Sequence, residues 1–322
     1  MKLPILKSSL VAALGICLSF SVINTSVAAD TNNQQLEVAN VGLLPNAETA
    51  AIRLGAKKGF FKEAGVDLRI TDTSSGAASI TALIAGQFDV VFANTVSVMQ
   101  GRDKGLPLIM IDAASTSTGV NGKDFSALVV SSTNTMKSAK ELSGKVIASN
   151  TVKNIGEVTA RLSVAKAGGD GASVKVVEMP FSNMEQALEQ GEIDAAWMVE
   201  PFHTTAIQHG LRDIASNYVD TAPHLTAAAF VSTDGIVQKK ADMIKKLRAA
   251  IVKSAEYANT HPDEIRAFIP TFTKITPAIA NAFVIPRYDP KVNVVSLEAM
   301  LPEMRRLGMI SSDFKVSSVI LK

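Results

Sequence analysis

The chain has 322 residues, of which 47% are hydrophobic, with 32 basic side chains, 30 acidic side chains and one cysteine. This length is enough for one large domain or two medium ones. The balanced charge argues against nucleic acid or an anionic membrane as a partner, and one cysteine cannot form an internal disulfide or a cysteine-based metal site.

Residues 1–29 have the layout of a secretory signal peptide. Lys2 and Lys7 precede an uncharged, largely apolar stretch over 8–27, and small residues end it just before Asp30. The stretch is long enough for a membrane anchor, but polar residues dilute its second half. Lipidation of Cys17 is a lesser alternative, because that residue lies inside the apolar core. We expect cleavage after Ala29 and export to the periplasm, which leaves a mature chain without cysteine and with equal numbers of basic and acidic side chains.

The next hundred residues alternate short apolar strands with amphipathic helices, which predicts parallel α/β units. Strands are expected over 36–43, 66–70, 88–92 and 108–111. One helix begins at Pro45-Asn46, and its Ala47, Ala50, Ala51 and Leu54 share a face. A second helix follows the polar turn at Thr73–Gly76 and carries Ile80 and Ile84.

The same order of elements recurs about a hundred residues later. Strands are expected over 146–149, 174–177 and 193–198, and a helix carries Ile155, Val158 and Leu162. Ser182 and Glu185 have the spacing of a capping box that would begin the next helix. A long helix is then expected from Asp242 to His261, and the remainder is helical with proline interruptions.

The two halves match residue by residue. Gly86-Gln87-Phe88-Asp89-Val90 aligns with Gly191-Glu192-Ile193-Asp194-Ala195, and Arg53-Leu54 aligns with Arg161-Leu162. Only two copies exist, so we predict two similar α/β lobes with mixed, mostly parallel sheets, not a solenoid. The expected division is 30–125 for the first part of lobe 1, 126–225 for lobe 2, and 226–322 for the return to lobe 1 with the C-terminal helices. The strands 125–130 and 227–231 are the expected crossings, a two-strand hinge.

Several of these segments together resemble one family. They are Gly55–Val66, Gly86–Val90, Gly105–Leu108, Leu142–Val146 and Gly191–Phe202. The resemblance is to substrate-binding proteins of ABC transporters in the sulfonate, nitrate, taurine and thiamine-precursor group, and it covers nearly all of 36–312. It implies the type II periplasmic-binding-protein fold, a small-molecule ligand, permease and ATPase subunits as partners, a monomer, and no cofactor. It does not identify the ligand.

Ligands of open α/β sheets bind outside the carboxyl ends of the strands, next to helix N-termini. The polar loops at those positions supply the candidate ligand-binding residues. They are Asn46, Glu48, Ser74, Ser75, Gly76, Asn94, Thr95, Asp112, Asn150, Thr151, Asn154, Trp197 and Glu200. Helix capping alone would also explain Asn46, Ser75 and Ser182, and the helix dipole alone would favour Glu48. Trp197 is equally compatible with a core position and with a ring that faces the ligand.

Charge and the remaining motifs bear on the chemistry of the ligand. Glu48, Asp112 and Glu200 would oppose an anion in a partly dry cleft, which favours a ligand with N–H donors or a neutral heterocycle of the pyrimidine-precursor type. Sulfonate and nitrate stay open, because helix N-termini can bind them. Asp89 and Asp194 are expected to accept hydrogen bonds from backbone N–H groups, and Phe60 and Phe61 to lie in the core.

Nothing in the sequence indicates catalysis. It contains no phosphate-binding glycine loop with lysine, no Gly-x-Ser-x-Gly elbow, and no histidine pair at metal-ligand spacing. Thiamine-precursor synthases resemble the family but carry a cysteine-rich motif, which the mature chain lacks. The predicted function is therefore a solute-binding protein that delivers its ligand to an ABC importer. The alternatives are a ligand-sensing subunit that docks on a membrane receptor and, less favoured, a periplasmic enzyme.

Overall fold

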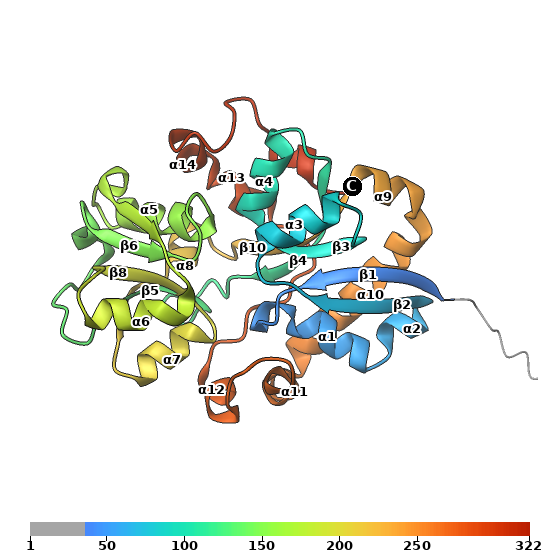
Figure 1. The fold of residues 1–322 in the computed structure, drawn as a ribbon, viewed down its shortest axis with the longest axis horizontal. Coiled ribbons are helices and arrows are strands. Elements are labelled where there is room, and N and C mark those ends of the chain that lie inside the picture. Colours follow the sequence, from blue (N-terminus) through green and yellow to red (C-terminus); the bar gives the residue numbers. More distant parts are fainter. Residues whose placement is uncertain (1–35) are drawn as a thin grey trace, which may run out of the picture. The chain divides into compact units, whose positions relative to one another are not determined.

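A computed structural model describes residues 36–322, so the predicted signal peptide lies outside the described residues. The strands form two five-stranded sheets, each with its own flanking helices (Figure 1). The first sheet has the order β2-β1-β3-β10-β4 and the second the order β7-β6-β8-β5-β9. In each sheet three parallel strands continue into an antiparallel pair.

Most strands lie where the predicted alternation placed them, and the strand Arg212–Ala215 was not predicted. The first sheet consists of β1 (Glu37–Leu43), β2 (Val66–Asp72), β3 (Val90–Asn94), β4 (Leu108–Thr116) and β10 (Thr226–Thr233). The second consists of β5 (Ser126–Val130), β6 (Val146–Ser149), β7 (Lys175–Glu178), β8 (Ala195–Val199) and β9 (Arg212–Ala215). The fold class predicted from the sequence, two α/β lobes with mixed sheets, is confirmed.

The helices fall into three groups. Helices α1 (Ala50–Lys57), α2 (Phe60–Glu63), α3 (Gly76–Ile84), α4 (Thr95–Asp103), α9 (Asp234–Lys239) and α10 (Ala241–Thr260) flank the first sheet. Helices α5 (Ile155–Lys166), α6 (Phe181–Glu189), α7 (Phe202–Gln208) and α8 (Asn217–Thr221) belong with the second. The last group is α11 (Pro262–Phe268), α12 (Pro277–Ala282), α13 (Val294–Glu298) and α14 (Leu301–Arg306). In residues 36–322 no helix combines the length and the apolar character that a membrane span requires.

One predicted helix start is wrong. Helix α6 begins at Phe181 after Pro180, without a side-chain cap, so Ser182 and Glu185 form no capping box. The Glu185 carboxylate instead contacts His209 at 2.6 Å. Pro180 occupies the N-cap position, one residue before the helix, and its side chain has no oxygen that could cap it. A capping box does occur in the short 3-10 helix Ala139–Leu142, between Ser138 and Glu141.

The two sheets repeat one structural detail that the sequence predicted. Asp89 Oδ2 accepts a hydrogen bond from the backbone N–H of Asn40 at 3.0 Å, and Asp194 Oδ2 accepts from that of Val146 at 2.8 Å. The backbone N–H of each aspartate donates back to the same partner residue. Both aspartates therefore join the start of a central strand to its neighbour, as expected, and neither is among the residues that line the cleft described below.

The chain crosses between the sheets twice, over 117–125 and over 216–225. The predicted crossing strands, β5 and β10, each lie wholly within one sheet and directly follow these segments. The two crossings are held side by side, since the Ser117 N–H donates to the Leu225 carbonyl at 2.9 Å and the Gly122 N–H donates to Ser216 Oγ at 2.8 Å. This supports lobe boundaries near 125 and 225, which stay a prediction.

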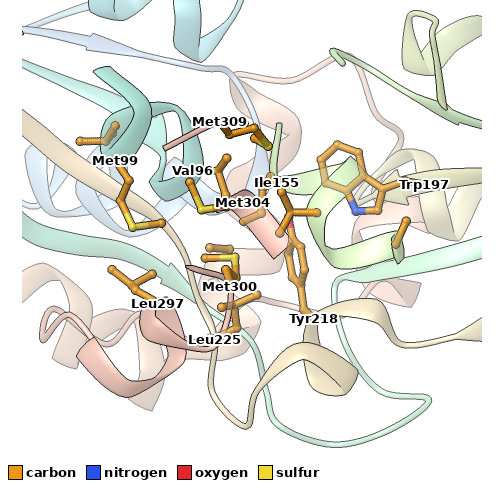
Figure 2. Packing of buried hydrophobic residues seen from close by; sticks show 14 of the residues in the cluster. Val96, Met99, Ile155, Trp197, Tyr218, Leu225, Leu297, Met300, Met304 and Met309 are labelled. Atoms are coloured by element: carbon orange, nitrogen blue, oxygen red, sulfur yellow. The ribbon is translucent and has the colours of Figure 1, made fainter. Parts of the chain in front are cut away.

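One hydrophobic cluster extends through both lobes. It contains Val96 and Met99 of α4 on one side and Ile155, Trp197 and Tyr218 on the other (Figure 2). Methionines of the C-terminal segment, Met300, Met304 and Met309, belong to the same cluster. Methionine is flexible and polarizable, so it can fill irregular space in a cluster to which both lobes contribute.

Candidate functional site

A cleft of about 960 Å³ is lined by loops from both sheets. In the first sheet these loops follow the carboxyl ends of β1, β2 and β3. In the second they follow β6, β7 and β8. The predicted residues that line it are Asn46, Glu48, Ser74, Ser75, Gly76, Asn94, Asn150, Thr151, Asn154, Trp197 and Glu200. Their role as ligand contacts stays a proposal.

The structure places Thr95 and Asp112 outside the cleft lining. Thr95 is fully buried, and its hydroxyl donates to the Thr226 carbonyl on β10 at 3.0 Å. Asp112 lies within β4, which continues to Thr116, and its carboxylate accepts hydrogen bonds from Arg248 of α10. Asp112 was expected at a strand end because the predicted strand stopped too early.

Aromatic side chains supply much of the remaining lining. Phe92, Phe181, Phe202, Tyr218 and Phe272 all face the cleft. The Phe181 and Phe202 rings stack with centroids 5.2 Å apart. Phe92 lies in a predicted strand and Phe202 lies in a segment of the family resemblance, and neither was predicted as a site residue. Their orientation depends on strand register, which the sequence pattern left open.

A third wall comes from the C-terminal region, which sequence reasoning missed. Phe272, Thr273, Lys274 and Ile275 lie between the 3-10 helix Ile269–Thr271 and α12, and all four line the cleft. This segment is more than 70 residues after the last predicted site residue. The only signal in the sequence is a set of prolines around it, and these indicate irregular backbone without indicating a site.

Trp197 forms part of the second-lobe wall. Its side chain is 4% exposed, and its indole N–H donates to Ser126 Oγ at 2.8 Å. The Phe181 ring centroid lies 5.5 Å away and the Tyr218 centroid 6.3 Å away. Trp197 thus packs in the core with one part of its ring at the cleft, so both sequence interpretations describe part of its environment.

The carboxylate of Glu200 accepts several hydrogen bonds from other residues of the protein. Its carboxylate accepts from the Thr204 N–H at 3.1 Å, from the Thr204 hydroxyl at 2.8 Å, and from the Val284 N–H at 3.1 Å. His203 Nδ1 lies 3.4 Å from the same group. Burial alone would lower the pKa of His203, but Asp213 and Glu200 outweigh it and raise the pKa to about 10. His203 is therefore a cation shared by Asp213, whose carboxylate lies 2.8 Å from Nε2, and the more distant Glu200.

Glu48 has a different environment. Its carboxylate accepts from Asn46 Nδ2 at 3.1 Å and from the Ser115 hydroxyl. Burial raises the pKa of the Glu48 carboxyl to about 7, although the hydrogen bonds from Ser115 and Asn46 act to lower it. Among residues 36–322, no arginine, lysine or histidine forms an ion pair with it. The Oδ1 atoms of Asn46 and Asn150 are buried, and neither accepts a hydrogen bond from any of residues 36–322.

The site has no arrangement that resembles a metal centre. Within the described residues, no three histidine, cysteine or acidic side chains come together as a metal site would need. What the cleft offers is a set of hydrogen-bond acceptors and donors from two lobes between aromatic walls. That is the composition of a small-molecule binding site, in which apolar walls bury the ligand and a few polar groups orient it.

Two α/β lobes of similar topology around such a cleft define a solute-binding protein of the periplasmic-binding-protein class. The chain belongs to the NMT1/THI5-like family, whose model matches residues 46–265. It is 24% identical over 233 residues, 71% of this chain and 69% of the relative, to a protein of Brucella abortus that bears the name "Putative binding protein". It is 23% identical over 245 residues, 74% and 71% of the two chains, to the formylaminopyrimidine-binding protein of Halalkalibacterium halodurans.

Solved structures show the same fold. The periplasmic aliphatic sulphonate binding protein of Escherichia coli superposes with a TM-score of 0.72 at 12% sequence identity. The match covers 89% of this chain and 92% of that one. At this level of identity the likeness concerns the fold, and the ligand has to be inferred from the residues of this cleft.

Proposed function

We propose that this protein, once exported to the periplasm, binds a small organic solute in the cleft and delivers it unchanged to the permease of an ABC importer. The observation that carries the proposal is the cleft itself, about 960 Å³ in volume and lined by strand-end loops of both sheets. Its volume falls near the upper end of the usual range for small-molecule sites, roughly 300–1,000 Å³. The family membership and the names of the relatives support the same reading.

The two crossings give this cleft a means to open and close. Segments 117–125 and 216–225 are the places where the backbone passes from one sheet to the other. A solute that contacts both lobes binds the closed arrangement better, so it shifts the population toward closure. A permease that docks on both lobes then distinguishes loaded protein from empty protein by their relative position.

The solute can be identified directly. The protein is purified under native conditions and unfolded, and the released small molecules are identified by mass spectrometry. The identified compound is then returned to refolded protein. At 100 times its Kd it should stabilise the fold by about 2.7 kcal/mol, and it should be recovered chemically unchanged after prolonged incubation.

The transport step needs a second measurement. Cells that lack the gene should lose uptake of the radiolabelled compound and regain it when the gene is restored. Conversion of the compound by the purified protein would contradict the proposal in favour of an enzyme. Normal uptake in the deletion strain, with binding retained, would favour a sensing role instead.

A further inference from the structure

Glu48 differs from the other carboxylates that line the cleft. Asp72 is paired with Arg53, and Glu200 is balanced by the protonated His203. Among residues 36–322, the ion pairs include none that involves Glu48. Its two hydrogen-bond donors, Asn46 and Ser115, are both neutral. Of the three carboxylates, therefore, only Glu48 lacks a positive partner within the described protein.

The carboxylate of Glu48 also has unused acceptor capacity. Each carboxylate oxygen can accept about two hydrogen bonds. Oε1 accepts one from Asn46 and Oε2 accepts one from Ser115, so each oxygen retains a further acceptor position. Because Asn46 directs its NH2 group at Glu48, its Oδ1 is presented as a third acceptor, and that buried atom has no donor in the described residues. This part of the cleft offers acceptors to a ligand.

The neighbouring groups pair no positive charge with Glu48: Lys274 lines the same cleft but forms no ion pair with it among residues 36–322. Tyr218 and Tyr288 are buried close enough for the Glu48 charge to contribute to the raised pKa of each phenol, and burial contributes most. Both phenols are therefore neutral at any physiological pH. The Tyr288 hydroxyl donates to the Ala47 carbonyl, away from the carboxylate. A partly buried carboxylate with no counter-charge is costly, and the cost is relieved when a cation arrives.

We propose that Glu48 determines the class of ligand, and that this ligand carries a positively charged, planar N–H edge of the amidine type. Two parallel N–H groups would each donate to one carboxylate oxygen, in the fork arrangement that planar cations form with carboxylates. The flat group that bears this edge would lie against the aromatic walls formed by Phe92, Phe181 and Tyr218. The proposal rests on the solute-binding function stated above and adds the chemistry of the solute.

Three probes that share one ring and differ in head group test this directly. Benzamidine is a cation with two N–H groups on one edge, benzamide is neutral, and benzenesulfonate is an anion. Binding of each probe to the purified protein is measured by isothermal titration calorimetry at pH 8, where Glu48 is ionised. Benzamidine should bind, and it should bind at least tenfold more tightly than either of the other two.

The matched variant is Glu48→Gln, which keeps the shape of the side chain and removes its charge. It should weaken benzamidine binding by roughly 10- to 100-fold, the usual range when a hydrogen bond to a charged group is lost. Glu63→Gln is the control, because it makes the same change at a residue that does not line the cleft. Its affinity for benzamidine should stay within twofold of the wild type.

The wild-type protein offers a second readout that does not depend on a variant. Benzamidine stays protonated between pH 5.5 and 8.5, so only the protein titrates in that interval. A cation needs ionised Glu48, and the pKa of free Glu48 is raised to about 7. Affinity should therefore increase as the pH rises through 7 and level off above it. Glu48→Gln should abolish this pH dependence.

Each alternative outcome overturns the proposal. These outcomes are benzenesulfonate or benzamide binding as tightly as benzamidine, absence of benzamidine binding, unchanged benzamidine affinity in Glu48→Gln, or affinity that falls as the pH rises. The solute-binding function is judged separately, by the compound that mass spectrometry identifies. Tight binding of an identified anion would remove the inference about Glu48 and leave the function standing.

Discussion

Gly156→Ala tests the packing of helix α5 against Trp197 in the second lobe. Gly156 lies in the first turn of α5, opposite the indole of Trp197. A Cβ added there would lie 2.2 Å from Cε3 and 2.5 Å from Cδ2 of Trp197, and 2.6 Å from Ser149 Oγ. Ordinary contacts between carbon atoms are about 3.5–4.0 Å. The indole would therefore have to move by more than 1 Å, a rough estimate from the difference between these distances.

The indole has little freedom to move. Its N–H is held by Ser126 Oγ at 2.8 Å, and Phe181 and Tyr218 pack around it. Overpacking of this kind costs about 1–3 kcal/mol, and loss of the Ser126 hydrogen bond would add about 1 kcal/mol. Alanine in a helix regains up to about 1 kcal/mol relative to glycine. We expect a net loss of about 1–3 kcal/mol in the free energy of unfolding.

The assay combines unfolding in urea with tryptophan fluorescence. Trp197 is the only tryptophan of the chain, so every change in emission reports on this position. The variant should unfold at lower urea, and its native emission should shift to longer wavelength as the ring is pushed toward the cleft. Gly235→Ala is the matched control, because its Cβ would meet nothing within 4 Å in another helix. That control should be neutral or slightly stabilised, by up to about 1 kcal/mol.

Equal stability of Gly156→Ala and Gly235→Ala, with unchanged native emission, would refute the reasoning. It would mean that α5 and the indole are farther apart than the structure places them. Loss of stability without a spectral change would be a weaker contradiction, because it would assign the strain to Ser149 and leave the ring in place.

The remaining predictions concern charge, motion and export. Glu200→Gln should lower the free energy of unfolding by about 1–3 kcal/mol in urea, because the Val284 N–H and His203 lose a charged partner; wild-type stability would contradict this. The folded pKa of His203, about 10, exceeds its ordinary value of 6.5. Its contribution to stability should thus be complete below pH 6.5 and fall progressively as the pH rises toward 10, a decline that His203→Asn should lack. Addition of the identified solute should reduce the radius of gyration in X-ray scattering, and equal values in both states would count against closure. N-terminal sequencing of protein from the periplasm should begin at Asp30, and an intact Met1 or a lipid on Cys17 would refute the predicted cleavage.

The fold could be predicted because its signals are local. Apolar runs separated by glycine turns gave most strand positions within about two residues, although β9 was not predicted, and the matched aspartates predicted a backbone contact in both sheets. The candidate site followed from a general property of parallel sheets, which place ligands outside the carboxyl ends of strands. Where it failed, at Asp112, the strand had been ended five residues early.

Long-range packing explains what could not be predicted. Phe272–Ile275 reaches the cleft because the C-terminal segment packs back over both lobes, and no local pattern encodes that path. The importance of Glu48 also depends on distant residues. From the sequence it was one of three equivalent acidic candidates. Arg248 neutralises Asp112, and His203 balances Glu200, so the difference lies in partners that only the fold brings together.

The internal sequence match predicts pairs of equivalent positions in the two lobes. The separation between Asn46 and Asn154 in the sequence equals that between Arg53 and Arg161. The separation between Phe92 and Trp197 equals that between Gly86 and Gly191. All four of Asn46, Asn154, Phe92 and Trp197 line the cleft. The separation between Asn46 and Asn154 also makes Gly156 the position equivalent to Glu48. Gly156 is the residue against which the Trp197 indole packs. A side chain there would exclude the indole from its present position. One lobe therefore has a carboxylate at this position, while the other has a glycine that leaves room for a large aromatic ring, and both the carboxylate and the ring line the cleft.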